Sequence, residues 1–183
     1  MPASPREELL EKVTDHVLAH GLIGLSLRPV AAAVGTSDRM LVYHFGTRDA
    51  LVSAVVERAG ARATAIVGAL PGAATVRSGV NRLWAAYLAE PLSSCLDVYC
   101  QAAATGLIGR EPYLSDARRS NEAWAAALRS YFVGCGAPPR KVERIVTLVD
   151  SALYGFHLDL ITDRPDELAR GVEDLAVAAQ SLA

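Results

Sequence analysis

The sequence has little lysine, few aromatic residues and few cysteines. Lys12 and Lys141 are the only lysines, aromatic residues make up 6%, and there are three cysteines in 183 residues. A small, odd number of cysteines does not form a disulfide framework and is typical of a reducing compartment. The 18 Lys+Arg against 20 Asp+Glu leave a net charge of −2. This balance excludes a polybasic, histone-like chain, so any contact with nucleic acid must come from local geometry.

The sequence also lacks a long hydrophobic run. No uncharged stretch reaches the roughly eighteen residues that a membrane helix needs. Glu7 and Glu8 near the start are not typical of a secretory signal peptide, which begins with basic residues. Hydrophobic residues nevertheless make up 51%, and the mean hydropathy is +0.23. The composition excludes intrinsic disorder and predicts a soluble, cytoplasmic protein with a large core.

Strand patterns are almost missing as well. Strict alternation of apolar and polar residues does not occur, whereas apolar residues at i, i+3 and i+4 recur nearly everywhere. The sequence therefore predicts an all-α fold of about nine helices. Their expected ranges are 4–20, 26–34, 37–45, 47–69, 76–89, 92–107, 114–132, 140–162 and 165–182.

The first of these helices has clear signals at both ends. Ser4 and Glu7 have the spacing of a capping box, and Pro5 occupies the first helical position. Gly21 follows His20 and is expected to end the helix as a left-handed cap.

The segment 26–51 predicts a helix-turn-helix. Gly35 and Thr36 form a tight turn between two short helices, and a third helix precedes the pair. Val30 and Ala31 are expected to face inward, as are Leu41 and Phe45 of the second helix. Ser37 caps that second helix and leaves its early N–H groups pointing outward, toward a phosphate or a base edge.

The run GLIGLSLRPVAAAVGTS at 21–37 and the run LVYHFGTRDAL at 41–51 resemble the DNA-binding region of the tetracycline-repressor (TetR) family of bacterial transcriptional regulators. The resemblance is specific over residues 8–56. It implies an N-terminal helix-turn-helix DNA-binding domain at 1–48 and a C-terminal helical domain for effector binding and dimerisation at 49–183. Two departures concern the bases that are read: the aromatic ring stands at Tyr43 rather than at Val42, and Arg39 and Met40 replace small residues and Thr.

The resemblance also implies roles for single residues. The positions expected to contact DNA are Arg28, Ser37, Arg39, Met40, Tyr43, His44 and Arg48. Arg28 or Arg39 has the chemistry to bond guanine O6 and N7 with both arms of its guanidinium. Ser37, Tyr43 and Arg48 can bond phosphates.

Simpler alternatives stand beside these roles. The arginines could be ordinary solvated charges, and His44 could only pack against Phe45. Asp38 is unfavourable beside a polyanion; it either caps its helix or accepts from a cytosine amino group.

The last two predicted helices are apolar on more than one face and must be buried on more than one face. A single helix-turn-helix reads few bases, so a homodimer that reads two half-sites is expected. The predicted dimer interface consists of Val142, Ile145, Val149, Leu153, Phe156, Leu160, Leu168, Val172 and Leu175. The alternative is that these residues form only the core of one chain.

The middle helices carry polar-tipped aromatic residues of the kind that line small-molecule pockets. The predicted pocket residues are Trp84, Tyr87, Tyr99, Gln101, Trp124 and His157. The same residues could also form an ordinary core. Because no basic cluster accompanies them, the effector is expected to be apolar or weakly polar.

Signals of catalysis are missing. Cys95 and Cys100 do not have the spacing of a metal-binding pair, and Cys135 is remote from both. The four histidines are scattered along the sequence. No phosphate-binding glycine loop and no nucleophile elbow occurs. We therefore expect no enzyme activity, no metal and no cofactor.

These observations predict a homodimeric TetR-type regulator that binds double-stranded DNA at a palindromic operator. The expected form is a repressor, which a small, mostly apolar ligand releases through the helix around 58–70. The alternative function is a helical ligand-binding or sequestering protein that has lost DNA binding.

Overall fold

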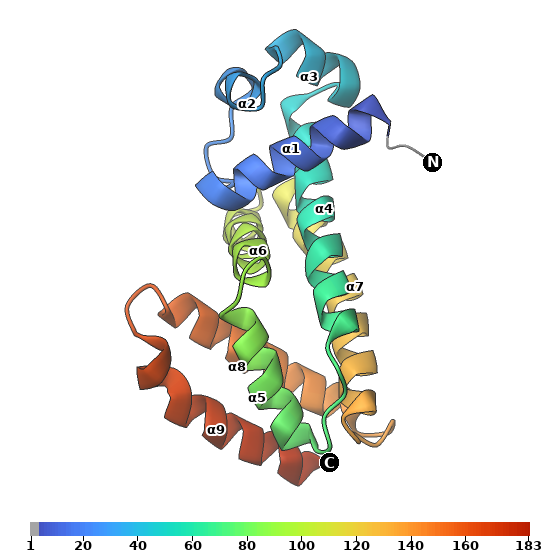
Figure 1. Cartoon of the computed structure of the whole chain (residues 1–183), viewed down its shortest axis with the longest axis vertical. Coiled ribbons are helices and arrows are strands. Elements are labelled where there is room, and N and C mark those ends of the chain that lie inside the picture. Colours follow the sequence, from blue (N-terminus) through green and yellow to red (C-terminus); the bar gives the residue numbers. More distant parts are fainter. Residues whose placement is uncertain (1–3) are drawn as a thin grey trace. The chain divides into compact units, whose positions relative to one another are not determined.

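The computed structural model describes residues 4–183, and these residues form nine helices and no strand (Figure 1). This confirms the predicted all-α fold. The helices are α1 (Pro5–His20), α2 (Leu27–Ala33), α3 (Asp38–Phe45), α4 (Arg48–Ala69), α5 (Val76–Tyr87), α6 (Leu92–Leu107), α7 (Tyr113–Gly134), α8 (Val142–Asp159) and α9 (Pro165–Leu182).

The ends of α1 illustrate where local sequence signals succeed and fail. The Ser4 side chain accepts a hydrogen bond from the Glu7 N–H at 3.2 Å, and the Glu7 carboxylate accepts from the Ser4 N–H at 2.8 Å. The predicted capping box is therefore confirmed. Gly21 has the expected positive φ of 91°, but its ψ of 162° is extended, so the prediction of a left-handed cap is wrong. From Gly21 the chain continues into the connection to α2.

Contacts divide the chain into two compact units. Among the described residues, unit 1 contains 4–63 and 94–123, and unit 2 contains 64–93 and 124–183. Helices α4, α6 and α7 each contribute residues to both units. This division by contacts differs from the boundary predicted between residues 48 and 49, since most of α4 and parts of α6 and α7 belong to the same unit as α1–α3.

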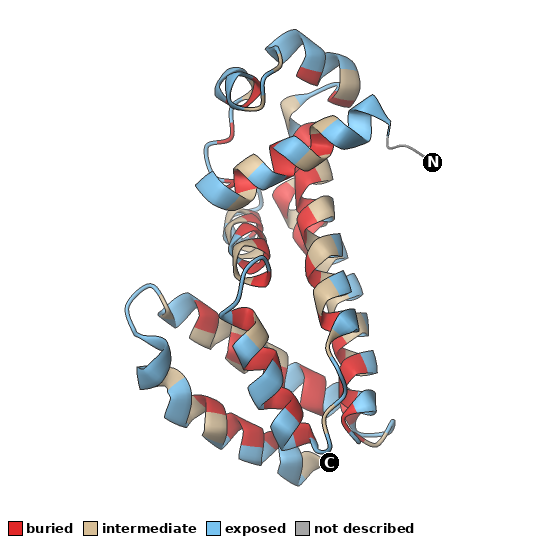
Figure 2. Ribbon diagram, in the orientation of Figure 1, coloured by how far each residue is buried: buried red, intermediate tan, exposed pale blue. Residues whose placement is uncertain are grey.

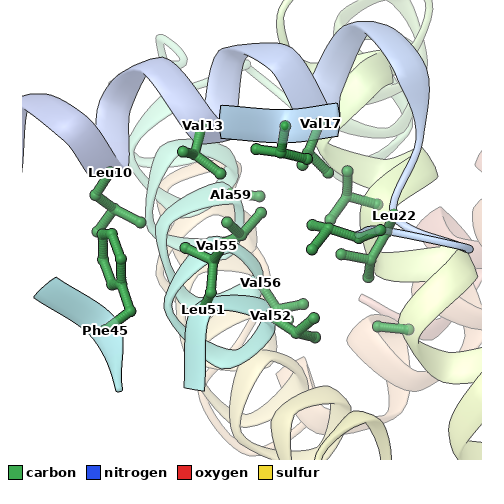
Figure 3. Packing of buried hydrophobic residues seen from close by; sticks show 14 of the residues in the cluster. Leu10, Val13, Val17, Leu22, Phe45, Leu51, Val52, Val55, Val56 and Ala59 are labelled. Carbon is green, nitrogen blue, oxygen red and sulfur yellow. The ribbon is translucent and has the colours of Figure 1, made fainter. Parts of the chain in front are cut away.

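Unit 1 is built on an apolar core between α1 and α4. Leu10, Val13 and Val17 of α1 lie opposite Val55 and Ala59 of α4 (Figure 3). All five are at most 5% exposed. Burial of each large aliphatic side chain contributes about 1.5–3 kcal/mol to folding. Phe45 and Leu22 join the same cluster, so this core also holds α3 and the connection between α1 and α2 in place.

Ion pairs reinforce the contact between α1 and α4. Arg58 and Arg62 of α4 both pair with Glu11 of α1, and Arg62 also pairs with Asp15 at 2.6 Å. These charges are partly exposed, and isolated exposed pairs contribute little. A shared network with a packed core beneath it orients α1 more firmly than one pair would.

Unit 2 consists of α5, α8 and α9 with the neighbouring ends of α4, α6 and α7. Helix α5 packs against α9, and α8 packs against both (Figure 1). Its core contains Leu83 of α5, Leu128 of α7 and Leu153 of α8, none of them exposed.

The residues predicted for the dimer interface fall into a buried and a partly exposed group. Val142, Ile145, Val149 and Leu153 of α8 are at most 6% exposed, and Val172 and Leu175 of α9 are at most 7% exposed. These six side chains lie in the core of unit 2. Phe156, Leu160 and Leu168 are partly exposed. The buried group contributes to the core of one chain, which is the alternative that the sequence left open; the dimer interface itself stays a prediction.

Over residues 4–183, no helix is both long and apolar enough to cross a membrane.

Candidate nucleic-acid interface

Helices α2 and α3 form a helix-turn-helix whose turn depends on Gly35. Gly35 has φ +73°, a left-handed conformation that glycine adopts without strain. The next residue, Thr36, donates its backbone N–H to the Ala31 carbonyl at 2.9 Å and closes the turn. Ser37 then caps α3, because its side chain accepts from the Met40 N–H at 3.2 Å. The predicted turn and cap are both confirmed.

Helix α3 has one buried side and a much larger exposed side. Leu41 is not exposed at all and Phe45 is 7% exposed, so they anchor α3 to the core as predicted. In Figure 2, the outer surfaces of α2 and α3 are coloured as exposed over most of their length. Met40 is 40% exposed and Tyr43 is 77% exposed. Large apolar and aromatic residues held outward on a short, firmly anchored helix are available to contact a ligand.

Arg28 and Arg39 face outward at the same hollow of the surface. The hollow has a volume of about 730 Å³, and it is lined by Leu25, Ser26, Leu27, Arg28, Asp38, Arg39, Val42 and Arg48. Among residues 4–183, neither Arg28 nor Arg39 forms an ion pair through its side chain. The Asp38 carboxylate accepts from the Arg39 backbone N–H at 2.9 Å, so it serves the first turn of α3 rather than either guanidinium.

Arg48 belongs to the same surface but is held by the protein. Its Nε donates to the Leu25 carbonyl at 2.8 Å, and its two terminal nitrogens donate to Tyr113 at 2.9 Å and Asp49 at 3.0 Å. Burial lowers the pKa of Arg48, but the bonds to Tyr113 and Asp49 outweigh this effect and raise it overall. Arg48 therefore links the start of α4 to the connection before α2 and to α7. The prediction of a phosphate contact did not include this structural role.

The remaining predicted DNA contacts lie on or beside α3. Ser37 and Tyr43 are exposed, whereas His44 is half-buried between Tyr43 and Phe45. The His44 ring meets the Phe45 ring edge-on, with centroids 6.4 Å apart. Its carbonyl accepts from Arg6 at 3.2 Å, and the Arg6 guanidinium lies over the Phe45 ring. His44 thus has the packing role that was the alternative to a DNA contact.

Two sets of hydrogen bonds that hold the elements near this surface were not predicted from the sequence. The Gln101 side-chain oxygen accepts from the backbone N–H groups of Leu22 at 2.7 Å and Ile23 at 3.0 Å. Gln101, predicted to line a ligand pocket, is thus bonded to the connection between α1 and α2. Asp116 is 3% exposed and accepts from the Ser53 hydroxyl at 2.8 Å, which ties α7 to α4. For Gln101 the sequence signal was one amide within a largely apolar stretch of α6, whereas Asp116 lies in a polar stretch of α7 and had no such signal.

The predicted pocket residues fall into two groups. Trp84, Tyr87, Trp124 and His157 belong to unit 2 and contact one another through Tyr87. Tyr99 and Gln101 belong to unit 1. The structure adds a residue that the sequence reasoning did not include, since the Trp124 ring donates to the Asp150 carboxylate at 2.8 Å. The available signal was a single acid within the apolar run from 145 to 158.

The described residues offer no other evident chemistry. No group of three or more His, Cys, Asp or Glu residues within 4–183 could hold a metal ion. The cysteines Cys95, Cys100 and Cys135 form no disulfide with one another.

Comparisons with known proteins identify the fold. No protein-family model and no curated protein matches the sequence. Among solved structures, a transcriptional regulator from Rhodococcus sp. Rha1 has a TM-score of 0.73 and 20% identity, covering 98% of this chain and 95% of its own. The multidrug binding protein EbrR in complex with proflavin has a TM-score of 0.72 and 20% identity, over 98% of this chain and 100% of its own.

A TetR transcriptional regulator from Legionella pneumophila has a TM-score of 0.68 and 15% identity, over 98% of each chain. The similarity therefore covers nearly the whole chain and includes all nine described helices. The chain has the fold of TetR-type transcriptional regulators.

Proposed function

We propose that this chain, which has the TetR-type fold, is a DNA-binding transcriptional regulator of that family rather than an enzyme. The observation that carries the proposal is the outward face of α3. Arg39, Met40 and Tyr43 are held in the open on a helix whose other side is anchored by buried Leu41 and Phe45. A helix of this kind fits the major groove of B-DNA, which is about 12 Å wide.

The chemistry of this face assigns a role to each side chain. Arg28 and Arg39 bond guanine edges, each with a discrimination of about 1–3 kcal/mol against the wrong base. Ser37 and Tyr43 bond phosphates and position α3, Met40 makes an apolar base contact, and His44 supports the neighbouring rings. Arg48 acts mainly as a structural residue, because its side chain donates to the Leu25 carbonyl and holds the connection before α2.

The regulator acts as a homodimer on a palindromic operator. Two half-sites about 34 Å apart are what two such helix-turn-helix modules read together. The partner surface consists of exposed residues of unit 2, in contrast to the buried set predicted from sequence. Leu148 and Leu158 of α8 are 37% and 43% exposed, and Val177 of α9 is 49% exposed. Ala152 and Gly155 lie between the two leucines on α8 and allow close approach.

The regulator is a cytoplasmic repressor that a small ligand releases from DNA. The aromatic residues that gather around Tyr87 in unit 2 support such a ligand. EbrR, which has a similar fold, is a multidrug binding protein that holds proflavin. Helix α4 runs from Arg48, at the DNA-binding surface, into unit 2, which makes it the path by which ligand binding changes operator affinity.

The test is selection of bound duplexes from a random DNA pool by the purified protein, with a salt titration of the selected sequence. We expect an inverted repeat with a steep loss of affinity as salt rises. The Arg28→Ala, Arg39→Ala double variant should lose this binding, whereas Arg118→Ala, which removes an exposed arginine of α7, should retain it. Failure to enrich any sequence at low salt contradicts the proposal and favours a ligand-sequestering protein.

A further inference from the structure

Five rings of unit 2 form a continuous cluster around Tyr87. Tyr87 lies 6.2 Å from Trp84, 6.1 Å from Trp124 and 6.1 Å from His157, measured between ring centroids. Trp84 also meets the Phe156 ring at 6.2 Å. These rings come from α5, α7 and α8, so three helices converge on the cluster.

A carboxylate lies at the Trp124 side of this cluster. Trp124 Nε1 donates to Asp150 Oδ1 at 2.8 Å, and both residues are half-buried. Asp150 precedes His157 by seven residues on α8, which places both on one side of that helix. We call the five rings together with Asp150 the aromatic–acid cluster.

Within residues 4–183, no Lys or Arg pairs with this carboxylate. Burial raises the pKa of Asp150, the hydrogen bond from Trp124 opposes that rise, and no Lys or Arg among the described residues contributes. Asp116, the other acid whose pKa is raised by burial, has Arg119 and Ser53 as partners. No Lys or Arg of residues 4–183 therefore supplies a positive charge beside Asp150.

Two features of the cluster, its carboxylate and its ring faces, both attract a cation. A half-buried carboxylate attracts a cation strongly, because the low-dielectric surroundings weaken the screening of charge. The faces of Trp and Tyr rings attract cations as well, by about 2 kcal/mol where water is excluded. A neutral ligand would cover the carboxylate without pairing it, and an anion would be repelled.

We propose that the aromatic–acid cluster binds an organic cation with a planar aromatic body, its charge against Asp150 and its ring against Trp124. This sharpens the expectation of a mostly apolar effector by adding one positive charge. It rests on the proposed function only where the ligand is called an effector of DNA binding; the binding site itself does not depend on that function.

The two tryptophans of the chain, Trp84 and Trp124, both belong to the cluster, so intrinsic fluorescence reports its occupancy. The probes are N-methylquinolinium, a planar cation, and 1-methylnaphthalene, its neutral counterpart of the same shape. We expect saturable quenching by the cation with an affinity about tenfold higher than that of the neutral compound. Equal affinities, or no quenching by the cation at millimolar concentration, would overturn the proposal.

Substitution of Asp150 isolates the charge. Asp150→Asn keeps an acceptor for Trp124 and should lower the affinity for the cation about tenfold, with the neutral compound changed less than about twofold. Asp159→Asn on the same helix removes an exposed acid outside the cluster and should change neither affinity. Asp150→Glu, which keeps the charge, should retain the preference for the cation. An unchanged cation affinity in Asp150→Asn would refute the assignment.

The outcomes separate this proposal from the proposed function. The fluorescence titration uses the full chain without DNA, so it succeeds or fails whether or not the protein binds an operator. Cation binding without any DNA binding contradicts only the regulator. DNA binding without a preference for the cation contradicts only the aromatic–acid cluster.

Discussion

The two units differ in where charged side chains that lack an ion-pair partner lie. In unit 1, the inner charges are paired, as between Glu11 and Arg62 or Asp116 and Arg119. Arg28 and Arg39, two of its arginines that form no ion pair within the described part of the chain, face outward from α2 and α3. In unit 2, Asp150 is a carboxylate with no Lys or Arg partner among residues 4–183, and it lies half-buried beside aromatic rings. Exposed arginines are accessible to a large polyanion such as DNA, whereas a half-buried carboxylate is accessible only to a small cation.

The largest expected effect tests whether DNA binding belongs to unit 1 alone. Leu41→Ala in α3 and Leu153→Ala in α8 each remove a side chain with no exposure. Each should lower the free energy of unfolding by about 2–5 kcal/mol, measured by urea denaturation. At a temperature where both variants are folded, only Leu41→Ala should weaken operator binding, because Leu41 sets the position of α3. Equal losses of DNA affinity would contradict the comparison.

The next effect concerns the outward arginines. Arg39→Ala and Arg28→Ala should each weaken binding to the selected operator by about 1–3 kcal/mol, or roughly 5- to 150-fold, because each loses base-edge bonds. Fluorescence anisotropy with a labelled duplex measures this loss. Arg118→Ala serves as the matched control on α7. An Arg39→Ala affinity within twofold of the wild type would remove Arg39 from the interface.

A smaller effect is expected at the link between Gln101 and the connection before α2. Gln101→Ala leaves the N–H groups of Leu22 and Ile23 without their acceptor. We expect a loss of about 1–2 kcal/mol in unfolding free energy, since only the Leu22 donor lies in a buried residue. Hydrogen exchange should also show faster opening at residues 21–25. Unchanged exchange there would show that Gln101 does not hold the connection.

The smallest effect is the pH dependence caused by Asp150. Its pKa in the folded protein is raised above the ordinary 3.8, mainly by burial. The folded state therefore binds more protons than the unfolded state above pH 3.8, so stability falls as pH rises through the raised pKa. Asp150→Asn should lack this fall and be more stable than the wild type at neutral pH. Urea denaturation across pH 4–8 measures it, and a less stable Asp150→Asn at neutral pH would contradict the account.

Much of the fold was predictable because its signals are local. Ser4 with Glu7, Gly35 and Ser37 each act over a few residues, and each has the predicted role. The predicted and observed helix ends differ most at the end of α8, where the chain turns at 160–163 before Pro165.

The site was predictable only in part because several partners are distant in sequence. Arg48 bonds Tyr113 and Gln101 bonds Leu22, contacts that span 65 and 79 residues. Six of the nine residues predicted for the dimer interface are buried within unit 2, because an apolar helix face can pack inside its own chain as well as against a second copy. Asp150 was not predicted as a site residue because its proposed role depends on the aromatic rings that α5 and α7 place around it.

The most direct measurement is selection from the random DNA pool repeated with Arg39→Ala. If α3 reads base edges, the variant should still enrich the inverted repeat but lose its preference at one base pair of each half-site. A selected sequence identical to that of the wild type would contradict the central claim that the outward face of α3 specifies the operator.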